Sequence, residues 1–266
     1  MAYLNPCTDL SQNTPQEETP QNNKTYILNE PFFMPAPHPL SLKKPFYGRL
    51  KGRPLSAEQK ALLTHWLPQV LFEPNEEKKP FEKAPLTLLE IGFGGGEHLF
   101  HLLNADPNAH ILGVEPYQNG IVKALQFIKK EPALQKRLRL SNQPISELWP
   151  FLPADSFDRI YILFPDPWPK KRHLKRRLIQ QDALQQCVRL LKPEGEIRIA
   201  SDDPAYIAHI LKTLNAEKQL TRVAGVRETD PQCWPQWPQD WPLTRYAQKA
   251  RVQNKPLGHF IFKKHP

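Results

Sequence analysis

The chain has 266 residues, which is enough for one large domain with a buried core or for two small ones. Hydrophobic residues make up 39% of the chain and charged residues 24%, a globular composition that excludes a wholly disordered chain. Lys and Arg number 36 against 27 Asp and Glu, and the resulting net charge of +9 favours a polyanionic partner.

The sequence argues against a secreted protein, a membrane-spanning protein and a protein held together by zinc. Cys7, Cys187 and Cys233 are too few and too scattered for a disulfide framework or a zinc site, which fits a reducing cytoplasm. No apolar run approaches the roughly 18 residues of a membrane span. The N-terminal segment lacks the basic and apolar regions of a signal peptide. We therefore expect a cytoplasmic protein without a metal site.

Residues 1–45 mix Pro, Asn, Gln, Thr and Glu with few periodic apolar positions. Such a segment buries too little apolar surface to offset its ordering entropy, so we predict a flexible arm. The alternative is a proline-rich strap that docks on the core through its few large apolar side chains, Tyr26, Ile27, Phe32, Phe33 and Met34.

One α/β domain is predicted over residues 46–266. Ser56 and Gln59 form a capping-box pattern ahead of apolar residues at helical spacing, and residues 73–85 form a charged linker rich in proline. Strands are then predicted at 86–91, 110–115, 137–140, 157–164 and 195–200, with helices from Glu97 and over 120–130, 175–191 and 205–214. Apolar strands that alternate with helices indicate a doubly wound, mostly parallel sheet.

A glycine-rich turn, EIGFGGG (90–96), connects the first predicted strand to its helix. Glycines let the backbone approach a ligand at the carboxyl end of a strand, where open α/β sheets bind ligands. Taken alone, this turn suits NAD, FAD, S-adenosylmethionine (SAM) or plain packing.

Two acids favour SAM. Glu115 ends the second strand, where a carboxylate accepts both hydroxyls of a ribose. Glu90 would bind the cationic amino acid end of a ligand and repel a pyrophosphate. A capping or ion-paired role for Glu90 and a solvated strand end for Glu115 remain the alternatives.

The most specific stretch is FPDPWPKKRHLKRR (164–177). Asp166 leaves a buried strand between two prolines, so a stiff loop holds its carboxylate, and Trp168 adds a flat wall. An acid and an aromatic at this edge suit an enzyme that modifies a base, although a similar Asp-Pro element occurs in amino-methylating enzymes. Six cations follow: Lys170, Lys171, Arg172, Lys175, Arg176 and Arg177. Cations at the N-terminus of a helix oppose its dipole and cost stability, and a polyanion would relieve that cost. We therefore predict that these residues contact nucleic-acid phosphates.

Five motifs, in this order, resemble the bacterial tRNA (guanine-N7)-methyltransferase family: LLEIGFGGGEHL, GVEPYQNGI, LFPDPWPKKRHLKRR, IRIASDDPAY and DWPLTRYAQKA. The resemblance runs from about Phe46 to the C-terminus. It implies a Rossmann-like fold with a seven-stranded sheet, and methyl transfer from SAM to N7 of a guanine in the variable loop of tRNA, at tRNA position 46.

The resemblance also implies roles for single residues. Glu90, Gly92, Gly94 and Glu115 match SAM-binding positions, and Asp166 matches the catalytic residue, which also lies at the SAM site. The substrate and tRNA positions are matched by Lys170, Arg172, Arg176, Asp202, Thr244 and Arg245.

Two departures from the family pattern stand out. Either Asn142 or Gln143 takes the place of the residue that holds the adenine. Ala247 replaces a glutamate in the C-terminal motif, which puts one substrate contact in doubt, with Glu228 and Asp240 as the acids that would compensate.

Several smaller questions stay open. Asp203 competes with Asp202, since one of the two is expected to cap the next helix. The tryptophans at 234, 237 and 241 either stack on bases or pack on the core. His98 and His101, spaced three apart on one helix, are assigned to packing and solvent, with no metal.

Guanine N7 is a neutral nucleophile, so we expect Asp166 to position the guanine and balance its charge and not to act as a base. The competing hypotheses are a methyltransferase for another base or a protein amide, and an RNA-binding protein without activity. The sequence leaves a monomer and a homodimer equally open.

Overall fold

The computed structural model describes residues 47–74, 81, 83–227, 229–238 and 241–266. The predicted arm, and with it the choice between a flexible segment and a docked strap, lies outside these residues. So do Phe46, part of the predicted linker, Glu228 and Asp240.

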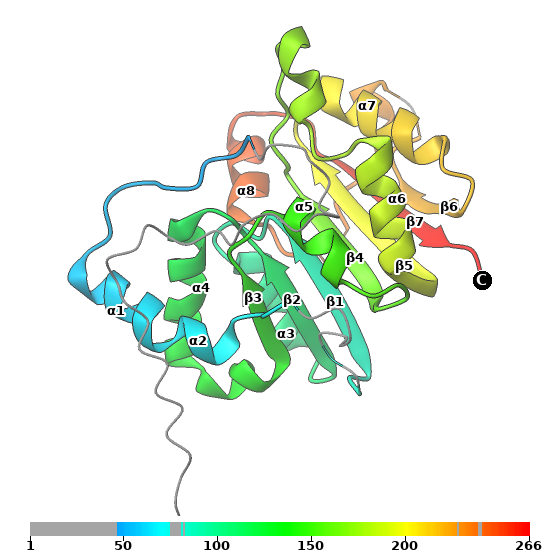
Figure 1. Cartoon of the computed structure of the whole chain (residues 1–266). Helices are drawn as coiled ribbons and strands as arrows, with labels where there is room; N and C mark the ends of the chain where they lie inside the picture. Colours follow the sequence, from blue (N-terminus) through cyan, green and yellow to red (C-terminus); the bar gives the residue numbers. More distant parts are fainter. Residues whose placement is uncertain (1–46, 75–80, 82, 228, 239–240) are drawn as a thin grey trace, which may run out of the picture. The chain divides into compact units, whose positions relative to one another are not determined.

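A seven-stranded sheet forms the centre of the described domain, with the strand order β3-β2-β1-β4-β5-β7-β6 (Figure 1). β1 to β5 pair in parallel, and β7 runs antiparallel to both β5 and β6. The order reverses between β1 and β4, the switch point where open sheets bind ligands. The strands span Leu86–Ile91 (β1), Ala109–Val114 (β2), Leu138–Ser141 (β3), Phe157–Leu163 (β4), Leu191–Ser201 (β5), Leu220–Gly225 (β6) and Gly258–Lys264 (β7).

Helices cover both faces of the sheet, as the strand–helix alternation predicted. Leu88 of β1 belongs to a core shared with α1 to α4, whereas its neighbour Leu89 belongs to a core shared with α5, α6 and α7. Successive strand residues point to opposite faces, so one strand serves two cores. The helices span Ala57–His65 (α1), Leu67–Val70 (α2), Glu97–Ala105 (α3), Gln118–Lys130 (α4), Ile145–Leu148 (α5), Gln181–Leu190 (α6), Pro204–Asn215 (α7) and Arg245–Val252 (α8).

The capping box before α1 is confirmed. The amide of Gln59 donates to Ser56 Oγ at 3.2 Å, and the amide of Ser56 donates to Gln59 Oε1 at 3.0 Å. These reciprocal bonds satisfy donors that a helix start otherwise leaves free, which is why the pattern located this helix.

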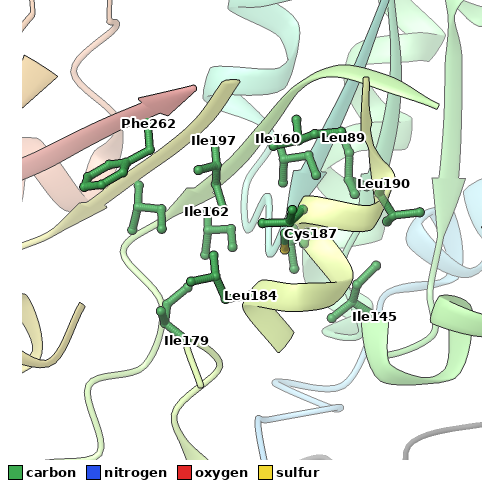
Figure 2. Packing of buried hydrophobic residues seen from close by; sticks show 14 of the residues in the cluster. Leu89, Ile145, Ile160, Ile162, Ile179, Leu184, Cys187, Leu190, Ile197 and Phe262 are labelled. Atoms are coloured by element: carbon green, nitrogen blue, oxygen red, sulfur yellow. The ribbon is translucent and has the colours of Figure 1, made fainter. Parts of the chain in front are cut away.

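The helix predicted over 175–191 is wrong at its start. α6 begins only at Gln181, because Gln180 is extended, and Lys171–Arg176 form a separate 3-10 helix. The basic run therefore does not sit at the N-terminus of a long helix, and the argument that it opposes that helix's dipole does not hold. The apolar face of α6 is confirmed: Leu184 and Cys187 pack on Ile162 and Ile197 (Figure 2).

Leu184 offers a test of this core. We expect Leu184→Ala to lower the free energy of unfolding by about 2–5 kcal/mol, because the lost side chain leaves a cavity among rigid strand residues. Val252→Ala on α8, where the side chain is 84% exposed, should change it by less than about 0.5 kcal/mol. Urea denaturation measures both, and equal effects would contradict the packing described.

Candidate active site

The glycine turn after β1 is held in place by the carboxylate of Glu115. The Gly94 amide donates to Glu115 Oε2 at 2.7 Å, and the Tyr117 amide at the start of α4 donates to Oε1 at 2.9 Å. Gly92 and Gly94 have φ of 78° and 58°, in the left-handed region that favours glycine. Glu115 is thus neither a solvated strand end nor free, and it joins the turn to the second strand–helix unit.

The glycine turn leaves room for a ligand on one side and none on the other. A Cβ added to Gly92 would meet no atom within 4 Å. A Cβ added to Gly120 of α4 would lie 2.4 Å from the Gly94 carbonyl oxygen. The turn therefore rests against α4, while the space beside Gly92 is open.

Glu115 lies within electrostatic reach of two other carboxylates. Burial raises the pKa of Glu115, its two backbone hydrogen bonds lower it, and the charges of Asp166 and Glu90 raise it again. Because β2, β1 and β4 are neighbouring parallel strands, the residues at their carboxyl ends share one edge of the sheet. The acids come from the ends of β1, β2 and β4.

Glu90 is buried against a histidine. The side chain is 2% exposed, and its Oε2 lies 3.1 Å from His98 Nδ1. The His98 ring also packs edge-on against Tyr161, with the ring centroids 4.6 Å apart. The assignment of His98 to packing and solvent missed this bond, whereas His101 is exposed. The contact spans the glycine turn and joins β1 to α3.

The loop that carries Asp166 is strained on both sides of the acid. Phe164 has φ of 53° and Trp168 has φ of 42°, a conformation that costs a bulky residue about 1–3 kcal/mol. The Phe164 amide still donates to the Ala200 carbonyl at 2.8 Å, so the strained turn begins at a paired strand end. Such strain persists only where surrounding contacts fix it.

The carboxylate of Asp166 is exposed at the rim of the site. Enough protein surrounds it to raise its pKa by loss of hydration, and the Arg49 guanidinium lowers the pKa in part. Arg49 precedes α1 and was not found by sequence reasoning. Its segment is tied to the cofactor side, since the Gln118 amide donates to the Leu50 carbonyl at 2.9 Å.

Trp168 does not offer a free stacking wall. The Arg176 guanidinium carbon lies 5.0 Å from the centre of the Trp168 ring and 4.6 Å from that of Tyr47. Arg176, predicted to contact tRNA, thus contacts two rings within the protein. The open aromatic surface is Tyr246, which is 48% exposed and stacks on Phe164 at 6.1 Å.

The basic run divides into exposed and enclosed cations. Arg176 is half-buried between its two rings, and Arg177 is buried. The cations that face solvent are Lys170, Lys171, Arg172 and Lys175. The predicted phosphate-contacting surface is therefore smaller than the six residues that the sequence indicates.

Asp203, and not Asp202, caps α7. Asp203 Oδ1 accepts the Tyr206 amide at 2.7 Å. Asp202, the predicted substrate residue, is left at the edge of the sheet, where its Oδ2 lies 3.3 Å from Lys255 Nζ. The sequence left open which of the two acids caps α7, and the structure assigns that role to Asp203. One residue is enough to cap a helix start, so Asp202 is not needed for it.

The C-terminal motif opens α8. Thr244, predicted to contact substrate, is buried, and its hydroxyl accepts the Ala247 amide at 3.2 Å as the helix cap. Ala247 is fully buried. Arg245 is exposed beside the glycine turn, since a Cβ added to Gly94 would lie 3.9 Å from its Nη2.

Asn142 and Gln143 both follow β3 and are both half-buried. The Glu115 amide donates to the Ser141 carbonyl at 2.9 Å, so either residue begins next to Glu115.

The three tryptophans of the C-terminal region pack within the protein. Trp241 lies in the core with α3 and α4, and Trp237 and Trp234 pack against the two cores.

The fold and these acids define a SAM-dependent methyltransferase of the seven-stranded, Rossmann-like class. A family profile described as "Putative methyltransferase" matches residues 84–259. Relatives described as tRNA (guanine-N(7)-)-methyltransferase match at 40% identity in Roseobacter denitrificans (82% of this chain, 94% of the relative) and at 37% in Rhizobium meliloti (82% and 94%). The chain belongs to the tRNA (guanine-N(7)-)-methyltransferase family.

Among solved structures, the aminoglycoside resistance methyltransferase NpmB1 has a TM-score of 0.49 at 15% identity, over 73% of this chain and 95% of that chain, a likeness too low to bear on function. No helix within the described ranges has both the length and the apolar character needed to cross a bilayer.

Gly120 tests the cofactor side of the site. We expect Gly120→Ala to lower the affinity for SAM by about tenfold or more, which corresponds to only about 1.4 kcal/mol, because the new methyl group would displace the Gly94 carbonyl. Lys123→Ala, on the exposed face of the same helix, should bind SAM as the wild type does. Isothermal titration calorimetry measures both, and wild-type affinity in Gly120→Ala would contradict the close contact.

Proposed function

We propose that this protein transfers the methyl group of SAM to N7 of a guanine in the variable loop of tRNA, at tRNA position 46, in the cytoplasm. The proposal rests on the position of Glu90, Glu115 and Asp166 at the carboxyl ends of three neighbouring parallel strands, with exposed cations directly after Asp166. The names of the relatives supply the nucleoside and the RNA class.

The cofactor side is assigned to Glu90, Gly92, Gly94 and Glu115, with Asn142 or Gln143 for the adenine. Each carboxylate oxygen of Glu115 accepts one backbone N–H and keeps a second lone pair, which leaves it able to accept ribose hydroxyls. SAM would supply a methyl group on a cationic sulfur. When the lone pair of a neutral nucleophile bonds to the methyl carbon, the C–S bond breaks and the sulfur leaves as the neutral thioether S-adenosylhomocysteine.

The protein's own contribution to the reaction is alignment and charge. Guanine N7 carries a lone pair at neutral pH, so no residue has to remove a proton first. Orientation of the reacting atoms is then the main source of rate. The guanine ring gains positive charge as N7 is methylated, and the fixed carboxylate of Asp166 stabilises that charge. Asp166 therefore acts in its ionised form.

The RNA side is assigned to the exposed part of the basic run. Lys170 and Arg172 face solvent directly after the Asp166 loop, and Arg245 flanks the glycine turn. Cations here neutralise phosphates without reading sequence. Asp202 is assigned to the guanine edge, because Ala247 offers no carboxylate and the Thr244 hydroxyl caps α8.

The product identifies the reaction. Purified protein incubated with unmodified tRNA and labelled SAM should give 7-methylguanosine in the variable loop on nuclease digestion and mass spectrometry. A transcript with adenosine in place of that guanosine should give none. Asp166→Asn should lower kcat by about 100-fold, because it removes the charge that stabilises the product ring. A different methylated nucleoside, no product, or near-normal turnover in Asp166→Asn would contradict the proposal.

The pH dependence follows from the raised pKa of Asp166. Loss of hydration raises this pKa, so the carboxyl takes up its proton at a higher pH than an ordinary aspartate, and kcat should fall there as pH decreases. Arg49→Gln removes a charge that lowers the pKa, so the acid limb of the kcat profile should move further upward in pH. Arg53→Gln is the matched control and should leave the limb in place. An unchanged or downward shift in Arg49→Gln would refute this account.

A further inference from the structure

Arg177 is the one cation of the basic run 170–177 that lies in the interior. It is 5% exposed, whereas four cations of the same run face solvent. A guanidinium is always charged and is costly to bury unless its donors are bonded. The partners of Arg177 therefore show what it does.

These partners belong to the loop of Asp166 and to the first turn of α7. Arg177 Nε donates to the Pro167 carbonyl at 2.8 Å, and Nη1 donates to the Ala205 carbonyl at 3.5 Å. The guanidinium carbon also lies 4.6 Å from the centre of the Tyr206 ring. Pro167 directly follows Asp166, and Ala205 and Tyr206 lie in the first turn of α7.

The first turn of α7 is itself held by hydrogen bonds of Tyr206 to two other residues. Tyr206 is fully buried, its hydroxyl accepts the Ile179 amide at 3.0 Å, and its own amide donates to Asp203. Asp203 is next to Asp202. One guanidinium thus connects the loop of Asp166 to the loop of Asp202, and a buried ring backs it.

The Asp166 loop depends on such a contact. Phe164 and Trp168 hold strained backbone on either side of it, and strain of this kind relaxes unless neighbours over-determine it. The planar fork of Arg177 contacts a carbonyl and a ring face in one fixed geometry, which the point charge of a lysine cannot reproduce.

We propose that Arg177 is a positioning residue that sets the placement of Asp166 relative to Asp202, and that it makes no contact with tRNA phosphates. The inference rests on the proposed function, in which Asp166 stabilises the methylated guanine. The sequence predicted that all six cations of the basic run contact phosphates. Under this proposal Arg177 contributes to the turnover rate and not to the affinity for RNA.

Two substitutions separate positioning from phosphate binding. Arg177→Lys keeps the charge and should lower kcat by about tenfold to 100-fold, because a displaced acid misaligns the reacting groups. Arg177→Gln removes the charge and should lower kcat as well. It should leave the slope of log tRNA affinity against log salt unchanged, whereas Lys175→Gln should reduce that slope by about one.

Arg189 supplies the matched control for a purely structural arginine. Its Nη1 and Nη2 donate to the carbonyls of Leu152 and Trp149, both at 2.7 Å, away from the acids. Arg189→Lys should lower the melting temperature and leave kcat at the wild-type value. Turnover is expressed per SAM-binding site counted by calorimetry, so an unfolded fraction does not imitate a slower enzyme. If Arg177→Gln fails to fold, Arg177→Lys carries the comparison of kcat.

The inference is overturned if either Arg177 variant keeps wild-type kcat, if Arg177→Gln reduces the salt slope as Lys175→Gln does, or if Arg189→Lys slows turnover equally. A failure of the proposed function would instead appear in the nucleoside that the wild-type protein makes. The two failures are therefore distinguishable.

Discussion

Glu115 joins three segments of the site, two through its carboxylate and one through its backbone amide. Its oxygens accept the amides of Gly94 and Tyr117, and its own amide pairs with the end of β3. The glycine turn, the start of α4 and the edge of the sheet are thereby held around one buried charge. A buried carboxylate is costly, and its two backbone hydrogen bonds offset part of that cost.

Arginine side chains pack on aromatic rings around the loop of Asp166. Arg176 lies between Tyr47 and Trp168, and Arg177 lies on Tyr206. Both arginines therefore stabilise the protein around Asp166, while the lysines of the same run face solvent. Arginine suits this interior role because its planar group stacks on rings and is more weakly hydrated than an ammonium. The net charge of the chain thus overstates the charge available to a polyanion.

Much of the fold was predictable because local patterns dictate it. Apolar strands and the Ser56–Gln59 box located β1 to β5 and α1, and the strand ends located Glu90, Glu115 and Asp166. The apolar pattern did not locate β6, β7 or α8. For β6 the reason is that it is a partly exposed edge strand, which pairs with a segment distant in sequence.

The roles that stayed hidden depend on contacts distant in sequence. Nothing in a run of six cations marks Arg177 as the buried one, because its partners lie on a preceding loop and on α7. The pairing of His98 with Glu90 crosses a turn, and the cap at Thr244 depends on where α8 begins. Arg49 reaches Asp166 only through the tertiary fold.

The left-handed backbone at Phe164 and Trp168 has an evolutionary consequence. Glycine at either position would adopt that geometry without strain, yet it would also remove a ring that packs against the site and free the loop to sample other shapes. Selection for a more robust fold and selection for a faster enzyme would then pull these two positions in opposite directions. The two aromatic residues therefore hold a loop geometry that glycine would adopt more easily but would not fix.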